Sequence, residues 1–272
     1  MYEILCLKTN IFAINAYFWE KRQKMSSKKW ILSGILPMCF MAGHSQVTGA
    51  KAAPSLEVKE VEACGHRYQV MLPQGNCDVE FSVQRPSAHD DSVLLSVAAA
   101  FTGEDLVTVC GDHIVGGKPL QGYADVTTTG HLLSHAGQVS IKPNSQLSQS
   151  MQVAVDGRGY LFQQCLIVDG GVGMTSHIPQ AILDRCACII YRAACVFSDG
   201  KFGVVQGIDE QYPNEFVAGL VAMGVDRALY LDMGTWAYGW YRTHAGAKPV
   251  DLSPCFDNTA HQSNWLVVKQ RK

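Results

Sequence analysis

Residues 215–241, "EFVAGLVAMGVDRALYLDMGTWAYGWY", hold a helix pattern, a strand pattern and a polar turn in immediate succession. Apolar residues recur at helical spacing in the first part: Phe216, Leu220 and Met223. Asn214 is a candidate N-cap and Gly224 a candidate stop. Residues 228–231 are all apolar, as in a central strand that is covered on both faces. This order predicts a helix beside a buried strand, with Asp232 just past the carboxyl end of that strand.

Aromatic side chains follow Asp232 closely: Trp236, Tyr238, Trp240 and Tyr241. Two interpretations of Asp232 are open. In the first, Asp232 and Gly234 form a turn, because Asp accepts backbone hydrogen bonds and Gly adopts left-handed angles. In the second, the carboxylate lies at the mouth of a cleft and the exposed rings form a wall that holds a sugar.

Short apolar or β-branched runs bounded by Gly, Asp and Ser predict further strands: residues 92–101, 151–155, 160–168, 188–197 and 202–206. Asp156-Gly157 and Asp199-Gly200 separate two pairs of these runs, and Asp-Gly suits tight hairpin turns. We expect residues 108–150 to form loops and short edge strands. The predicted fold class is α+β, with mixed, largely antiparallel sheets and a few covering helices.

Composition excludes some classes of function. The chain has 272 residues, of which 47% are hydrophobic and 17% are charged, and its formal net charge is -2. These values are typical of a globular protein with a sizeable core. We expect no nucleic-acid partner, because the chain has no basic excess and no run of Lys and Arg interleaved with aromatic residues.

The N-terminal part has the pattern of an export signal. Met25 is a candidate start, two lysines follow it, and residues 30–43 are apolar but too short to span a bilayer. Cleavage before Gln46 would release the mature chain, and Ala50 is a second candidate. We therefore expect an exported protein that is periplasmic, at the cell surface or secreted, with no transmembrane span in the mature chain.

Three segments follow from this interpretation. Residues 1–45 would be an upstream extension and signal peptide, residues 46–62 a leader or linker, and residues 63–272 the functional domain. The sequence does not indicate an oligomeric state.

The ten cysteines become eight if Cys6 and Cys39 leave with the signal. Export permits disulfides, and Cys64 and Cys77 are the pair that is nearest at hand. Other cysteines lie in apolar, strand-like runs, where Cys serves as a small hydrophobe. Since there is no CxxC and no zinc-finger spacing of Cys and His, we expect no metal site and no cofactor.

Several stretches resemble, in the same order, segments of the phosphodiester glycosidase family. Residues 215–241 are similar to that family's helix, strand and "LDGGGS" segment, and "VAAAFTG" (97–103) is similar to its "NGGFF" segment. Three more stretches match weaker motifs: "CGDHIVGGKP" (110–119), "GYLFQQCLIVDGG" (159–171) and "YRAACVFSDGKF" (191–202). The resemblance spans residues 92–242 and implies a hydrolase that cleaves sugar 1-phosphodiesters in a glycan or envelope polymer.

The chain departs from the family pattern at functionally important positions. Ala98 stands where the family has Asn, and "LDGGGS" becomes "LDMGTW", with Met233, Thr235 and Trp236 in place of small residues. The alternative to an enzyme is therefore a non-catalytic saccharide-binding protein on the same fold. Asp232 and Gly234 are retained.

The resemblance implies catalytic roles for Arg192 and Asp232. A phosphate leaving group lessens the need for a general acid, so the enzyme must hold the phosphate and meet the positive charge on the sugar. Arg192 suits the phosphate, because its donors are planar and paired. Asp232 suits activation of water or stabilisation of the oxocarbenium-like centre. Alternatively, Arg192 pairs with a buried carboxylate, which could be Asp232 itself.

The remaining candidates would contact the substrate: Gly234, Thr235, Trp236, Asp112, His113 and Asp169. Each has a structural alternative. His113 is equally suited to a surface loop, since its ordinary pKa does not make it a proton carrier. Asp169 precedes two glycines and suits a turn.

Overall fold

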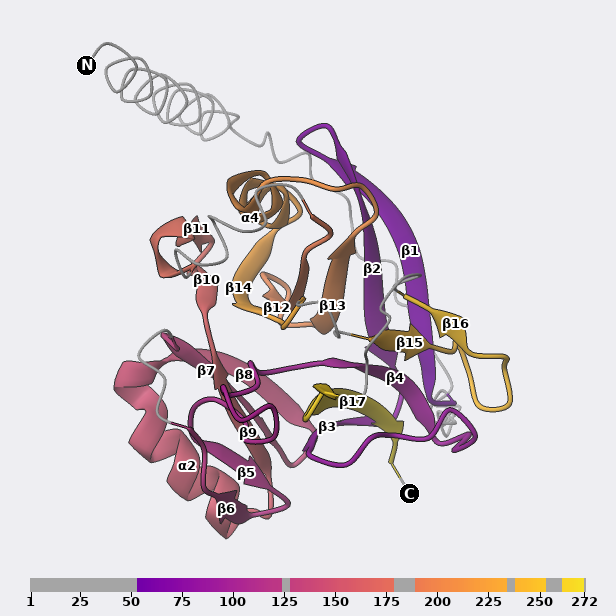
Figure 1. Cartoon of the computed structure of the whole chain (residues 1–272). Coiled ribbons are helices and arrows are strands. Elements are labelled where there is room, and N and C mark those ends of the chain that lie inside the picture. The colour runs from indigo at the N-terminus through magenta and orange to yellow at the C-terminus, as the bar shows by residue number, and fades with distance from the viewer. Residues whose placement is uncertain (1–52, 124–127, 179–188, 234–237, 253–260, 272) are drawn as a thin grey trace, which may run out of the picture. The chain divides into compact units, whose positions relative to one another are not determined.

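The computed structural model describes residues 53–123, 128–178, 189–233, 238–252 and 261–271 (Figure 1). By its internal contacts the chain divides into residues 1–49 and 50–272, and all described residues belong to the second unit. These residues form three β-sheets in which every strand pair is antiparallel, together with two α-helices. The expected sheet-rich fold is confirmed, and its helical part is small. None of the described helices is long and apolar enough to cross a membrane.

Sheet 1 has seven strands, in the order β1 (Ser55–Ala63), β2 (His66–Gln74), β13 (Phe202–Gly207), β12 (Arg192–Phe197), β14 (Val225–Tyr230), β10 (Leu166–Asp169) and β11 (Val172–Gly173). β1 pairs with β2 over its whole length, so the segment that the sequence analysis placed in a linker is an edge strand from Ser55 onward. The expected Asp199-Gly200 hairpin is present between β12 and β13. β14 is central and flanked by β12 and β10, as the apolar run predicts.

Two smaller sheets complete the fold. Sheet 2 consists of β16 (Val250–Asp251), β15 (Gly239–Tyr241), β4 (Val93–Ala98), β17 (Trp265–Gln270) and β3 (Cys77–Ser82), in that order. Sheet 3 consists of β6 (Lys118–Leu120), β5 (His113–Val115), β9 (Tyr160–Gln164), β7 (Gly130–His135) and β8 (Gln138–Pro143). Residues 108–150 therefore contain more regular structure than their Gly- and Ser-rich composition indicates.

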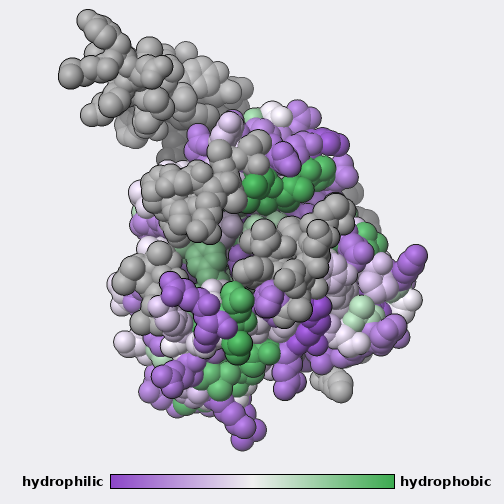
Figure 2. Space-filling view, in the orientation of Figure 1, coloured by the Kyte–Doolittle hydropathy of each residue, from purple (hydrophilic) through white to green (hydrophobic). Residues whose placement is uncertain are grey.

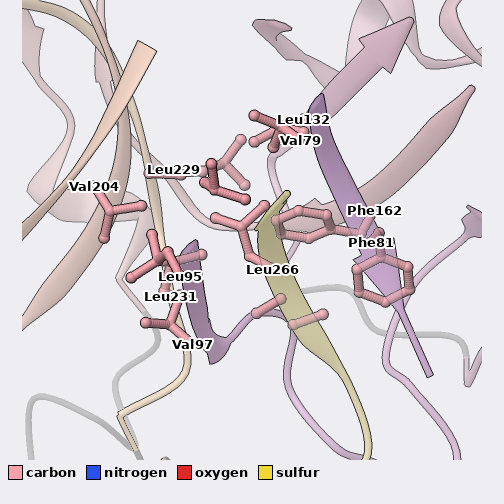
Figure 3. Close-up of a cluster of buried hydrophobic side chains, with 14 of the residues drawn as sticks. Val79, Phe81, Leu95, Val97, Leu132, Phe162, Val204, Leu229, Leu231 and Leu266 are labelled. Carbon is pink, nitrogen blue, oxygen red and sulfur yellow. The ribbon is translucent and has the colours of Figure 1, made fainter. Parts of the chain in front are cut away.

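The three sheets share one hydrophobic core (Figure 3). Sheet 1 contributes Val204 and Leu229, sheet 2 contributes Phe81, Leu95 and Leu266, and sheet 3 contributes Leu132 and Phe162. All of these side chains are buried. Burial at about 25 cal/mol per Å² of apolar surface makes this core the main attraction between the sheets.

Helix α4 (Pro213–Ala222) covers one face of sheet 1 (Figure 1). It begins one residue before the expected cap Asn214, since Glu215 accepts the N–H of Tyr212 at 2.9 Å and satisfies the helix start instead. Gly224 follows the helix with φ +82°, which confirms the predicted stop. Phe216 and Leu220 pack on the strands below, so the helix and strand of residues 215–231 are arranged as expected.

Helix α2 (Leu147–Asp156) replaces a predicted strand. Residues 151–155 were expected to form a strand in a hairpin with the next run, and this prediction was wrong. Ser150 and Ala154, four residues apart, are the buried positions of the helix, while the β-branched Val153 and Val155 are exposed. The helical period was hidden because one of its buried positions is a serine.

Cys64 and Cys77, the pair that the sequence analysis considered for a disulfide, are both free thiols. Cys64 lies in the turn before β2 and Cys77 follows β2. The nine residues of β2 hold the two ends about 30 Å apart, far beyond the reach of a disulfide.

Figure 2 shows one face of the molecule, on which most of the described surface is hydrophilic and hydrophobic residues gather in separate groups. One described cavity, of about 380 Å³, lies beside the C-terminal end of α4. Its lining includes Val61 of β1, Leu72 of β2 and Met223, the residue that follows the helix. Its lining includes neither Arg192 nor Asp232.

Candidate functional site

Asp232 lies where the chain passes from sheet 1 to sheet 2. The N–H of Leu231 donates to the carbonyl of Arg192 at 3.0 Å, which is still a contact within sheet 1. The N–H of Asp232 donates instead to the carbonyl of Ala99, just past β4, at 2.9 Å. Asp232 is therefore held by backbone hydrogen bonds at the junction of the two sheets, where 8% of its surface is exposed.

Arg192 is the first residue of β12 and is completely buried. Its Nε donates to Oε1 of Gln206, its partner across the β12–β13 ladder, at 2.8 Å. The amide nitrogen of Gln206 donates in turn to the carbonyl of Leu252 at 2.6 Å. These two bonds orient the guanidinium, because Gln206 is itself fixed between Arg192 and the segment after β16.

Gly239 of β15 lets the guanidinium of Arg192 approach sheet 2 closely. A Cβ atom at Gly239 would lie 3.1 Å from both terminal nitrogens of Arg192 and 2.9 Å from Val97 Cγ1. A larger residue would have to displace one of these groups. Because Gly239 has no side chain, the guanidinium of Arg192 can occupy this space.

Tyr230, which the sequence analysis did not select, belongs to the same cluster. It ends β14, is buried, and packs its ring 5.8 Å from Phe101 and 6.2 Å from Tyr191. A weak signal was present in the sequence, since Tyr230 is the one phenol in the apolar run and lies two residues before Asp232. We call Arg192, Gln206, Tyr230 and Asp232 the Arg192 cluster.

Burial and charge set the ionisation of the Arg192 cluster. Burial lowers the pKa of Arg192 to about 9, and Tyr230 and Asp232 oppose this shift. The guanidinium therefore remains charged at neutral pH. Burial, followed by the charge of Asp232, raises the pKa of Tyr230 well above its ordinary value, so the phenol stays neutral. The cluster combines a cation, a carboxyl group and a neutral hydroxyl group.

A buried amide lies beside the cluster, although Ala98 replaces the family's Asn. Asn264, the residue before β17, accepts the N–H of Ala100 at 2.7 Å and donates to the carbonyl of Ala100 at 3.0 Å. Both ends of the amide thus bind the turn after β4, so Asn264 supports the backbone near Asp232. No local sequence pattern pointed to this residue.

The structure does not bring Asp112 and His113 to the cluster. Asp112 is exposed, and His113 is buried in β5 with its ring 5.6 Å from Phe81. Burial lowers the pKa of His113, which favours the neutral ring. Strands β17 and β4 separate Phe81 from Gly239, on which Arg192 packs.

Asp169 is the last residue of β10 and lies beside the other end of the neighbouring strand β14. Its carboxylate is 3.4 Å from the guanidinium of Arg227, five residues before Asp232. At the rise of a β-strand this is a separation of about 17 Å. Asp169 therefore forms a separate ion pair with Arg227.

Three expected substrate contacts, Gly234, Thr235 and Trp236, lie outside the described residues. Of the neighbouring rings, Trp240 is buried and packs with Trp265, while the guanidinium of Arg242 lies 5.4 Å from the centre of its ring. Trp240 therefore belongs to the core of sheet 2 and is not an exposed wall for a sugar.

Comparison with solved structures relates the fold of this chain to that of a known catalytic domain. The structure is similar to that of zebrafish N-acetylglucosamine-1-phosphodiester alpha-N-acetylglucosaminidase, auto-inhibited by its pro-peptide. The TM-score is 0.56 at 12% sequence identity, over 85% of this chain and 87% of that chain. The two proteins share a fold.

Other comparisons add little to this likeness. A hypothetical protein from Synechocystis is similar at a TM-score of 0.47 and 12% identity, over 80% of this chain and 62% of that one, which is too low to support an argument. No protein-family model and no curated protein matches the sequence. At 12% identity, the likeness to the zebrafish enzyme is a likeness of fold alone.

Proposed function

We propose that the protein is an exported hydrolase that cleaves a sugar 1-phosphodiester in a glycan or envelope polymer. The observation that carries this proposal is the meeting of Arg192 and Asp232 at the junction of sheets 1 and 2. The similarity in fold to the zebrafish phosphodiester glycosidase supports it. Both residues also fall in the sequence stretches that resemble the family.

Asp232 would act on the attacking water. A water oxygen forms the new bond to the anomeric carbon while the bond from that carbon to the phosphate oxygen breaks. The electron pair leaves with the phosphate, and the water proton passes to the carboxylate of Asp232. As a carboxylate, Asp232 would also stabilise the positive charge that develops on the sugar ring.

Arg192 would serve the leaving group. A guanidinium neutralises the phosphate oxygens as the carbon–oxygen bond breaks. Because Arg192 is completely buried, direct contact with the phosphate requires the covering chain to move. Without such a movement, Arg192 acts on the reaction only by its charge beside Asp232.

The full burial of Arg192 also supports a second candidate, a saccharide-binding protein on the same fold that has lost catalysis. In this case Arg192 and Asp232 stabilise the junction of the two sheets. The loss of the family's Asn at Ala98 favours this candidate as well.

Hydrolysis of a panel of sugar 1-phosphodiesters, beginning with an α-N-acetylglucosamine 1-phosphate ester, separates the two candidates. We expect the protein to release sugar and Asp232→Asn to lose about a hundredfold or more in kcat. Asp169→Asn is the matched control, because Asp169 pairs with Arg227 away from the cluster, and it should keep its activity. If the whole panel is left intact while a saccharide binds, the protein is a binding protein.

A further inference from the structure

A second cavity, of about 410 Å³, lies where the edge of sheet 2 meets sheet 3. Its walls are β3, which is the last strand of sheet 2, the turn between β7 and β8, and the turn between α2 and β9. The titratable side chains that line it come from four separate segments: Asp78, Glu80, His135, Arg158, Tyr160 and Arg271. We call this cavity the Arg158 groove.

Close packing fixes the walls of the Arg158 groove. Arg271 donates to Asp78 at 2.7 Å, and its guanidinium packs so closely on Gly137 that a Cβ atom there would overlap it. The ring of His135 packs equally closely on Gly157, at the end of α2. Both turns therefore depend on a glycine and hold the groove in one shape.

One cationic group in the groove has no ion-pair partner in the described part of the chain. Arg158 is exposed and makes no ion pair there, whereas Arg271 is already paired with Asp78. Nδ1 of His135 is buried against Gly157 and is not accessible from the groove. The groove thus offers the cation of Arg158 for a ligand.

Arg158 stands where glycine would be less strained. It follows α2 with φ +53°, in the left-handed region that commonly ends a helix on glycine. Gly117 packs against its backbone, since a Cβ atom at Gly117 would lie 2.8 Å from the Cα of Arg158. A strained residue in a fixed pocket wall is typical of functional sites.

Glu80 and Tyr160 form the opposite side of the groove. The phenol of Tyr160 and the carboxylate of Glu80 interact, since, after the larger effect of burial on each group, Tyr160 lowers the pKa of Glu80 and Glu80 raises the pKa of Tyr160. Burial raises the pKa of Glu80, and Lys269 opposes this shift. A carboxyl group and a hydroxyl group side by side suit the hydroxyl groups of a sugar, whereas a bare anion would be repelled by the carboxylates of Asp78 and Glu80.

We propose that the Arg158 groove binds an anionic monosaccharide, a uronate or a sugar phosphate. Arg158 meets the carboxylate or phosphate of the ligand, since a guanidinium binds either through paired donors. Glu80 and Tyr160 meet its hydroxyl groups, which keep the ligand's charge away from the two carboxylates. The volume suits a single sugar unit. This proposal does not depend on the function proposed above.

The test is calorimetric titration of the full chain at pH 7 with four probes: glucuronate, glucose 6-phosphate, glucose and inorganic phosphate. We expect glucuronate, glucose 6-phosphate or both to bind at least tenfold more tightly than glucose and phosphate. Arg158→Gly should lose at least tenfold of this affinity while its Tm is unchanged or higher, because glycine adopts a positive φ without strain. The raised or unchanged Tm separates loss of the ligand from loss of the fold.

Two further variants locate the binding. Lys59→Ala removes one exposed positive charge from β1, outside the groove, and should leave the affinity unchanged. Asp232→Asn should also bind normally, which excludes the Arg192 cluster. The proposal is overturned if Arg158→Gly binds like the unchanged protein, if phosphate or glucose binds as tightly as the tighter of the two anionic sugars, or if no probe binds at millimolar concentration.

Discussion

The hydrogen bond with Gln206 helps to hold the buried charge of Arg192. Gln206 accepts from the guanidinium and donates to Leu252, so its amide satisfies two buried groups at once. Removal of this acceptor leaves the buried Nε donor of a charged guanidinium without its hydrogen bond, which costs more than the hydrogen bond itself contributes. The stability of the sheet junction therefore depends on a residue that need not touch substrate.

We predict that Gln206→Met lowers the free energy of unfolding by about 3 kcal/mol, because methionine has a similar shape but offers no strong acceptor to Arg192. Urea denaturation measures the loss. Gln74→Met is the matched control, since Gln74 donates to Glu57 at 2.8 Å on the exposed edge of sheet 1, and it should change stability by less than about 0.5 kcal/mol. Equal losses in the two variants would contradict the role of Gln206.

Some residues at the sheet junction can be predicted from the sequence, and others cannot. Asp232 and Arg192 lie in local patterns, one after a strand and one at the start of a hairpin, and the structure brings these two together. Gln206 and Asn264 reach the same junction only through pairing across strands, so no local pattern marks them. Asp112 and Asp169 have suitable chemistry but lie on other elements, because side-chain type says nothing about position.

Strand β7 contains a histidine that cannot readily be charged. His131 is completely buried, and burial lowers its pKa from 6.5 to about 4. The unfolded chain takes up a proton in this window and the folded chain does not. Stability is therefore complete above about pH 6.5 and falls as the pH is lowered toward 4.

We predict that this one group removes about 3 kcal/mol of stability between pH 7 and pH 4. Urea denaturation of the protein and of His131→Leu at both pH values measures it, and the variant should lose less stability on acidification. His89→Leu removes an exposed histidine and should behave like the unchanged protein. An identical pH dependence in His131→Leu would show that other groups cause the loss.

Helices and strands could be predicted where the apolar residues followed one clear spacing, either that of a helix or that of a strand. The β12–β13 hairpin and the pair of α4 and β14 follow from apolar runs, turn residues and stops that agree with one another. Helix α2 does not, because valines favour a strand while the packing of Ser150 and Ala154 on sheet 3 favours a helix. Tertiary packing decided that segment, and a single sequence does not show it.

At the scale of the whole molecule, all described residues belong to one unit, residues 50–272. Regular structure begins at Ser55, where β1 joins sheet 1. We predict that limited trypsin digestion of the protein cuts first before Ser55, at Lys51 or earlier, and leaves a fragment that is stable and folded. Mass spectrometry identifies the cut, and a first cut at Lys59 or Arg67 would contradict the role of β1 in the fold.

Strand β17 lies between β3 and β4 and pairs with both, so the last described strand is the partner on which two of the earliest strands depend. A growing chain cannot complete sheet 2 until residues 265–270 have been made. The loop that must close is nearly as long as the unit itself, and such non-local pairing slows folding. During synthesis β3 therefore has no paired neighbouring strand until β17 is made. Such unpaired strand edges are prone to aggregation and can be bound by chaperones. Deletion of residues 265–270 would therefore disrupt sheet 2, because β3 and β4 would lose the strand that joins them.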